Sequence, residues 1–172
     1  MFEKLNLNLS LDLVTLEQLQ SMRSDRWGAD TFQSHYILDL QRVLDIVASQ
    51  IKFNILPDYS NFTFIKSLGA YIIHSDGLGI ALNIYIQSGG ETTTFYNNPT
   101  NHRLYTDTPR FYLYDKNQLE FKDSFQAVTN DCYLLDTECP HSVSNIHGTR
   151  KILRLIWREA KFTDILNSIE II

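Results

Sequence analysis

The chain has 172 residues, of which 44% are hydrophobic and 20% are charged, and its formal net charge is −5. This composition is typical of a globular protein and excludes a disordered chain, and the length suits one domain with a sizeable core. The acidic balance argues against a stable nucleic-acid partner, because phosphate binding needs a basic surface.

Several features favour a protein of the cytoplasm. No apolar run is long enough to cross a bilayer, so no membrane partner is expected. The first residues contain an acidic side chain and no continuous apolar stretch, which argues against a signal peptide. Two cysteines are too few for a disulfide scaffold and are consistent with a reducing compartment.

The first part of the chain, residues 1–60, has the pattern of a helical support. Residues 15–18 fit a capping box that opens a short helix to about residue 22. Apolar residues then recur at spacings of three and four between positions 32 and 51, after Asp30. This spacing predicts a long amphipathic helix packed on a sheet, with Pro57 ending the helical part.

From residue 61 the hydrophobic period changes to that of strands, and glycine and proline become more frequent. Short β-branched and aromatic runs predict eight strands, at 62–67, 70–76, 81–87, 91–96, 110–115, 119–122, 131–136 and 150–157. The runs at 110–115 and 119–122 are expected to form a hairpin.

These strands predict a single mainly β domain with N-terminal helices. The expected core, residues 61–158, is a double-stranded β-helix, or jelly roll, with helices on one outer face and residues 159–172 as a tail. In the alternating segment 81–87, Asn83, Tyr85 and Gln87 would point into the barrel. The three apolar residues between them, Leu82, Ile84 and Ile86, would lie under the long helix.

His74, Asp76 and His141 are the candidate metal ligands. His74 and Asp76 are two residues apart, so on an extended chain both side chains leave the same face. His141 follows Cys139 and Pro140 at the end of a later strand and would supply the third ligand. Two histidines and one carboxylate that leave open positions on the metal are typical of non-haem Fe(II) oxygenases.

With these residues and a following basic strand, the chain resembles the 2-oxoglutarate- and Fe(II)-dependent oxygenase superfamily, especially its prolyl-hydroxylase-like branch. Arg150 lies nine residues after His141, and Trp157 closes the strand, as in that branch. The resemblance runs from about Tyr71 to Trp157, half of the chain. It implies that Fe(II), 2-oxoglutarate and O₂ are used to hydroxylate an unactivated C–H bond, with release of succinate and CO₂.

The resemblance also implies a site for the far carboxylate of 2-oxoglutarate. An arginine binds a carboxylate through two parallel hydrogen bonds. The family spacing favours Arg150 as this anchor, and Arg154, on the same strand face, is the alternative. Tyr71, Asn83 and Tyr85 are candidates to donate hydrogen bonds to the cosubstrate.

Two other functions remain open at this point. One is a cupin-type metalloprotein, such as an isomerase or a dioxygenase that does not use 2-oxoglutarate; the His-Ser-Asp sequence at residues 74–76 argues against it, because cupins usually carry His-x-His and a following glutamate. The other is a non-catalytic jelly-roll binding module without metal. The substrate is expected to be a small molecule or a peptide, and the sequence does not indicate the oligomeric state.

Overall fold

The structure is a computed structural model that describes residues 1–7, 9, 11, 20–25, 33–70, 72–77, 79–100, 103–105 and 111–172. For residues 20–25, 33–37, 66–70 and 105 the structure describes the backbone alone. Within these ranges no helix is long and apolar enough to cross a membrane.

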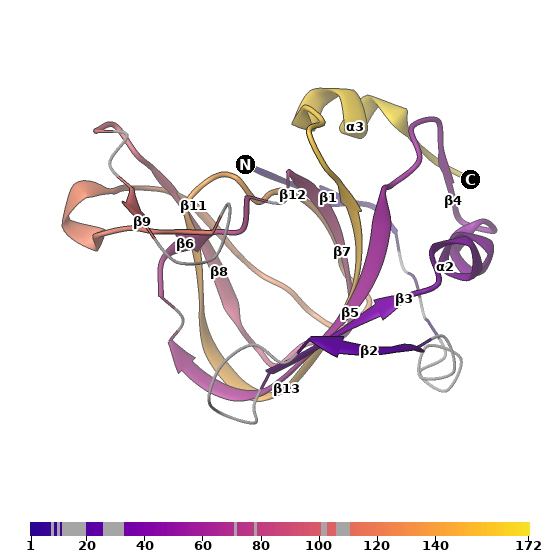
Figure 1. Ribbon diagram of the computed structural model, residues 1–172, viewed down its shortest axis with the longest axis horizontal. Coiled ribbons are helices and arrows are strands. Elements are labelled where there is room, and N and C mark those ends of the chain that lie inside the picture. The colour runs from indigo at the N-terminus through magenta and orange to yellow at the C-terminus, as the bar shows by residue number, and fades with distance from the viewer. Residues whose placement is uncertain are drawn as a thin grey trace.

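Antiparallel strands form two facing layers (Figure 1). The larger layer contains seven strands, in the order β1 (Phe2–Leu5), β12 (Cys132–Asp136), β7 (Ile80–Gln87), β13 (His141–Trp157), β5 (Tyr59–Ala70), β3 (Gln33–Leu38) and β2 (Gln20–Asp25). The second layer joins β11 (Glu120–Gln126), β8 (Thr92–Asn97), the start of β13, β6 (His74–Ser75), β10 (Tyr112–Leu113) and β9 (Leu104–Tyr105).

Strand β13 belongs to both layers. Its residues 141–144 pair with β8, whereas residues 151–157 pair with β7. Between these parts the pairing with β5 shifts by one residue, from Ile146 opposite Leu68 to Thr149 opposite Lys66, and Asn145 has a positive φ of 61°. Because one strand continues from layer to layer, the two sheets form one barrel. The predicted double-stranded β-helix is therefore confirmed.

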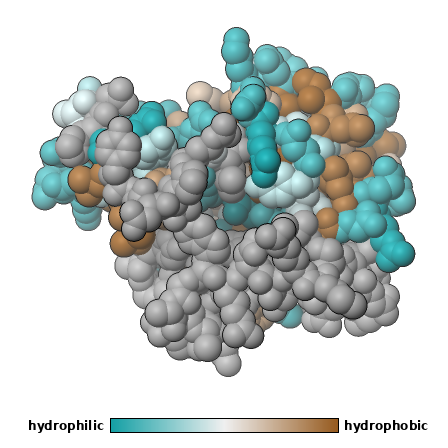
Figure 2. All heavy atoms as spheres, viewed as in Figure 1, coloured by the Kyte–Doolittle hydropathy of each residue, from teal (hydrophilic) through white to brown (hydrophobic). Residues whose placement is uncertain are grey.

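Short helices and a small second sheet cover the outer face of the larger layer. They are α2 (Leu40–Val47), α3 (Phe162–Ser168) and the pair β4 (Ile51–Phe53) and β14 (Ile169–Ile171), while the 3-10 helix η1 (Lys116–Gln118) lies between β10 and β11. In Figure 2, hydrophobic atoms gather on the side that carries α3 and β4. Four exposed apolar side chains belong to the segments around the small sheet, namely Ile55, Leu56, Ile171 and Ile172.

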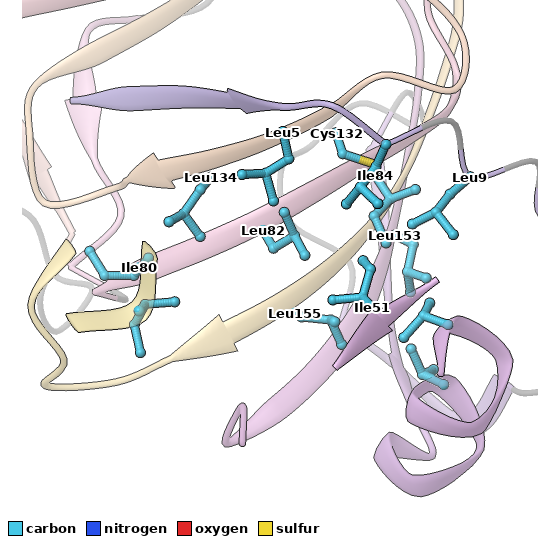
Figure 3. Close-up of a cluster of buried hydrophobic side chains, with 14 of the residues drawn as sticks. Leu5, Leu9, Ile51, Ile80, Leu82, Ile84, Cys132, Leu134, Leu153 and Leu155 are labelled. Carbon is cyan, nitrogen blue, oxygen red and sulfur yellow. The ribbon is translucent and has the colours of Figure 1, made fainter. Parts of the chain in front are cut away.

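The main core lies between the larger sheet and these helices (Figure 3). Leu82 and Ile84 of β7 and Leu153 and Leu155 of β13 are fully buried there. Each such side chain stabilises the fold by roughly 1.5–3 kcal/mol relative to exposure. Val43 of α2 belongs to the same cluster, so a helix does cover the apolar face of residues 81–87, but it is the short α2 and not the long helix that was expected.

A second cluster fills part of the space between the two layers. Tyr85, Phe95, Phe125, Tyr133 and Ile152 are buried there, and the rings of Phe125 and Tyr133 stack at 3.9 Å. Tyr85 and Ile152 are opposite each other on β7 and β13. After the register shift, the inner face therefore carries the even-numbered residues of β13 and the odd-numbered residues of β7.

The prediction that residues 1–60 are helical is wrong for most of the part that the structure describes. Residues 33–38, expected in the long helix, form β3 and pair along their whole length with β5. The helix is confined to α2, where the Asp39 side chain accepts a hydrogen bond from the Arg42 amide and so caps its N-terminus. Residues 15–18 and Asp30, on which the helix prediction rested, lie outside the described residues.

The hairpin expected from residues 110–122 is also wrong. Strand β10 pairs with β6 and β9, and β11 pairs with β8 instead. Residues 116–118 form the 3-10 helix η1, with Asp115 as its N-cap, rather than a hairpin turn. The two strands therefore diverge and join different neighbours in the second layer.

Candidate metal centre

Neighbouring strands bring His74, Asp76 and His141 together. His74 on β6 is directly opposite His141 on β13, and Asp76 follows β6 by one residue. One potential ligand atom from each residue lies within 4.8 Å of the others, and this is the one such group of three among the described residues. The structure thus brings the three potential ligands close enough together that they could hold one metal ion.

Both imidazoles are held by the backbone in the same way. His74 Nδ1 lies 2.9 Å from the carbonyl oxygen of Ile72, and His141 Nδ1 lies 2.9 Å from that of Cys139. A carbonyl oxygen only accepts hydrogen bonds, so each Nδ1 carries the proton. Nε2 is therefore the ring nitrogen with which each histidine can bind a metal, and the outer hydrogen bond fixes its direction.

Asp76 uses its two oxygens differently. Oδ1 lies 3.2 Å from His74 Nε2, whereas Oδ2 accepts a hydrogen bond of 3.0 Å from Arg154 Nη2. With Nδ1 of His74 protonated, an imidazole lone pair and a carboxylate oxygen face each other. A proton or a metal ion between them would relieve that repulsion, because both atoms are acceptors.

The pKa values of His141 and Asp76 leave both side chains able to bind a metal ion at neutral pH. Burial and the neighbouring His74 lower the pKa of His141 to about 4, so this ring is neutral. Burial by itself would raise the pKa of Asp76, but the contact with His74 and the charge of Arg154 hold that pKa far below its usual range. Asp76 is thus ionised.

One aromatic ring packs beside each of the two histidines. The ring of Phe111 lies 5.2 Å from that of His74, and Phe95 lies 5.6 Å from His141. His74 and His141 are each only 7% exposed. These rings restrict water around the centre, which strengthens electrostatic interactions there.

Arg150 forms a buried ion pair with Glu91. Its Nε donates a 2.7 Å hydrogen bond to Glu91 Oε1, and its guanidinium lies 5.6 Å from the centre of the Tyr85 ring. Glu91 is fully buried, and its other oxygen accepts hydrogen bonds from the Gly89 amide and the Ser88 hydroxyl. Among the described residues Glu91 is the sole side-chain hydrogen-bond partner of Arg150.

Among the described residues, five buried side-chain polar atoms have no hydrogen-bond partner, although nearly all such atoms in folded proteins do. They are Asn61 Oδ1, Asn83 Oδ1, Tyr85 Oη, Thr93 Oγ1 and Arg154 Nε. All five belong to strands β5, β7, β8 and β13, around the interior. Unsatisfied groups concentrated in one region point to a place where something else binds.

Sequence reasoning missed Glu91, Thr93 and Asn61. It assigned residues 91–96 to a strand, and that alternation already places Glu91 and Thr93 on the same face as Phe95. A glutamate at the start of an otherwise β-branched strand was the available signal. Tyr71, a proposed cosubstrate contact, lies outside the described residues.

The geometry defines a double-stranded β-helix whose interior carries a potential metal site of two histidines and one aspartate. A scan against models of protein families finds no match, and a search of curated proteins also finds none.

Solved structures with a similar fold include the vicilin of Corylus avellana (hazelnut), at 8% identity and a TM-score of 0.45 over 76% of this chain and 30% of that one. The vicilin of Capsicum annuum gives 6% identity and a TM-score of 0.47 over 79% and 31%. Lactobacillus farciminis oxalate decarboxylase in a formate complex gives 10% identity and a TM-score of 0.42 over 91% and 34%. This chain spans about a third of each matched chain, and similarities this low do not indicate a common activity.

Proposed function

We propose that this chain is a 2-oxoglutarate- and Fe(II)-dependent dioxygenase that hydroxylates an unactivated C–H bond. The observation that carries the proposal is the set of His74, Asp76 and His141 next to a barrel interior with two paired arginines and unsatisfied polar atoms. We further propose a cytoplasmic protein that acts on a small molecule or a peptide.

The three side chains fit Fe(II). Two histidines and one carboxylate are the donor set of non-haem Fe(II) oxygenases. Ligand atoms that lie about 2.1 Å from one ion at right angles are roughly 3 Å apart, and His74 Nε2 and Asp76 Oδ1 are separated by 3.2 Å. Arg154 occupies the second oxygen of Asp76, so the carboxylate would bind through Oδ1 alone.

The charges of the interior fit a dianion together with a divalent metal. The pairs Arg150–Glu91 and Arg154–Asp76 each sum to zero. A divalent ion at the centre would therefore add two uncompensated positive charges in a largely buried site, which is costly. 2-Oxoglutarate carries two negative charges and would restore neutrality.

Arg150 is suited to hold the far carboxylate of that dianion. Glu91 binds Nε and leaves the two terminal nitrogens of Arg150 available for a bidentate contact. The unpartnered hydroxyls of Tyr85 and Thr93 are two further donors on the strands around it. Arg154 is less suited, because its Nη2 is already bound to Asp76.

When bound, Fe(II) and 2-oxoglutarate would supply O₂ activation coupled to oxidative decarboxylation, which yields succinate and CO₂. The residues of this chain would bind and orient these groups. His74, Asp76 and His141 would hold the ion, Arg150 would fix the cosubstrate, and Phe95 and Phe111 would limit water near the reacting atoms.

Succinate formation tests the proposal. The Fe(II)-loaded protein would be incubated under air with 2-oxoglutarate and a panel of candidate substrates, and succinate measured beside the hydroxylated product. We expect succinate to form in step with one product and to vanish in His141→Ala. A protein that binds Fe(II) but shows no affinity for 2-oxoglutarate by calorimetry would refute the proposal, whatever substrates were tried.

A further inference from the structure

One row of side chains across three strands holds three of the unpartnered atoms. Arg154 of β13 is directly opposite Asn61 of β5 on one side and Asn83 of β7 on the other. Directly opposite residues in antiparallel strands point to the same face, with Cβ atoms roughly 5 Å apart. The Asn61, Asn83 and Arg154 side chains therefore form a polar row on the inner wall of the barrel.

The atoms in this row are complementary in type but do not satisfy one another. Arg154 Nε is a donor without a partner, and Asn61 Oδ1 and Asn83 Oδ1 are acceptors without partners. Asn61 is 8% and Asn83 is 4% exposed, so bulk water does not solvate them. A donor between two acceptors that leaves all three unbonded indicates that another group bridges them.

We propose that Asn61, Asn83 and Arg154 form a subsite for a neutral primary carboxamide of the substrate. The carbonyl oxygen of such a group accepts from Arg154 Nε, and its NH₂ group donates to Asn61 Oδ1 and Asn83 Oδ1. One acceptor and two donors on one planar group match one donor and two acceptors on the wall.

The charge balance of the row favours a neutral carboxamide over a carboxylate or an ammonium group of similar size. Arg154 is already paired with Asp76, so the row has no net charge to offset an added carboxylate or ammonium. A carboxylate would also offer no donor to the two asparagine oxygens, and an ammonium would offer no acceptor to Nε. A neutral amide meets both conditions.

The row lies beside the metal centre, which makes it a substrate subsite. Arg154 bridges the two, because Nη2 contacts the proposed metal ligand Asp76 while Nε faces the subsite. The Asp76 and Arg154 side chains are 17% and 12% exposed, so solvent reaches the end of the row that adjoins the metal centre. In this respect the inference rests on the proposed function, since it places the bound amide close to the reacting atoms.

The test compares three probes that differ in one property each. Propionamide, N,N-dimethylpropionamide and propionate would be titrated into the full chain and their binding followed by ligand-observed NMR. The protein would be studied with Zn(II) and 2-oxoglutarate and again without either. We expect propionamide to bind at least about tenfold more tightly than the other two, because each loses hydrogen bonds with buried partners.

Variants identify the subsite. Asn61→Leu and Asn83→Leu preserve side-chain size but remove one acceptor each, and each should weaken propionamide about tenfold. Asn167→Ala, at an exposed asparagine of α3, is the matched control and should leave binding unchanged. Equal binding of all three probes to the parent, no binding of propionamide, or parent-like affinity in both leucine variants would overturn the inference.

Two further arms distinguish a free amide from one in a peptide. Asparagine and glutamine serve as free amino acids, and N-acetyl-asparagine methylamide has a side chain as its sole primary amide. Preferential binding of either class supports the subsite and identifies the source. A protein that binds propionamide but not 2-oxoglutarate would refute the proposed function alone, and the reverse result would refute this inference alone.

Discussion

The Glu91–Arg150 pair allows a quantitative prediction about stability. Glu91 is fully buried and accepts three hydrogen bonds, of 2.7 Å from Arg150, 2.8 Å from the Gly89 amide and 3.2 Å from Ser88. Glu91→Gln keeps the shape but removes the charge and turns one acceptor into a donor that faces another donor. Breaking a buried ion pair on one side costs about 3–5 kcal/mol, because the remaining charge is left without a partner.

Urea unfolding measures this loss. With a slope of about 2 kcal/mol per molar urea, a loss of about 3 kcal/mol lowers the midpoint by roughly 1.5 M. Glu170→Gln is the control, because Glu170 forms an exposed pair with Lys52 and its loss should not move the midpoint measurably. If Glu91→Gln lowers the midpoint no more than Glu170→Gln does, the pair does not support the barrel.

A double variant separates the charge from the packing. Glu91→Leu together with Arg150→Met replaces both partners by apolar groups, which is often neutral for a buried pair. We therefore expect the double variant to be more stable than Glu91→Gln alone. A double variant that is less stable would show that hydrogen bonds to the Gly89 turn, rather than the unpaired arginine, account for the loss.

Four other outcomes follow from the site and the core. Replacing any one of the three proposed metal ligands by alanine should abolish Fe(II) binding in a metal titration. The unfolding midpoint should change little for the two histidine variants, whereas Asp76→Ala should lower it because Arg154 loses its partner; parent-like Fe(II) binding in two of the three variants would refute the assignment. Arg150→Ala should weaken the binding of 2-oxoglutarate at least about a hundredfold in calorimetry, and far more than it weakens metal binding. Arg154→Ala should have the smaller effect. If the parent and Arg150→Ala bind 2-oxoglutarate equally well, Arg154 becomes the first alternative for the residue that binds its far carboxylate. The pKa of His141 is about 4 in the folded protein and about 6.5 in the unfolded chain, so the unfolded chain binds more protons between these values. The metal-free protein should therefore lose roughly 1 kcal/mol of stability per pH unit as the pH falls from 6.5 towards 4. Urea titrations of His141→Gln should show a weaker pH dependence. Burial raises the pKa of Cys132 to about 12, so iodoacetamide at pH 8 should modify it only after unfolding, as mass spectrometry would show.

The β core was predictable because its strands carry a local signal. Residues 81–87 alternate between the apolar face that packs under α2 and the inner face that holds Asn83 and Tyr85. The grouping of His74 with Asp76 follows from the same alternation. The prediction that His141 lies near His74 came from the family resemblance, since no local pattern joins residues 67 positions apart.

The N-terminal strands and the interior contacts were not predictable from local patterns. Residues 33–38 lie within an apolar spacing typical of a helix, yet hydrogen bonds to β5, which begins about twenty residues later, keep them extended. Glu91 and Arg150 are 59 positions apart and meet because β8 and β13 share a sheet. Such pairings depend on tertiary contacts, which the hydrophobic periodicity and the turn-forming residues of the sequence do not reveal.

The register shift in β13 makes the barrel sensitive to insertions and deletions of single residues. Side chains on a strand alternate, so His141 and Arg150, nine residues apart, would face opposite sides of an uninterrupted strand. The extra residue between Ile146 and Thr149 corrects the parity and turns both into the barrel. A one-residue deletion there would turn Arg150 and Arg154 towards the apolar core under the helices and would turn Leu153 and Leu155 into the barrel interior. We therefore expect single-residue insertions and deletions here to be more damaging than substitutions at the exposed residues of the segment.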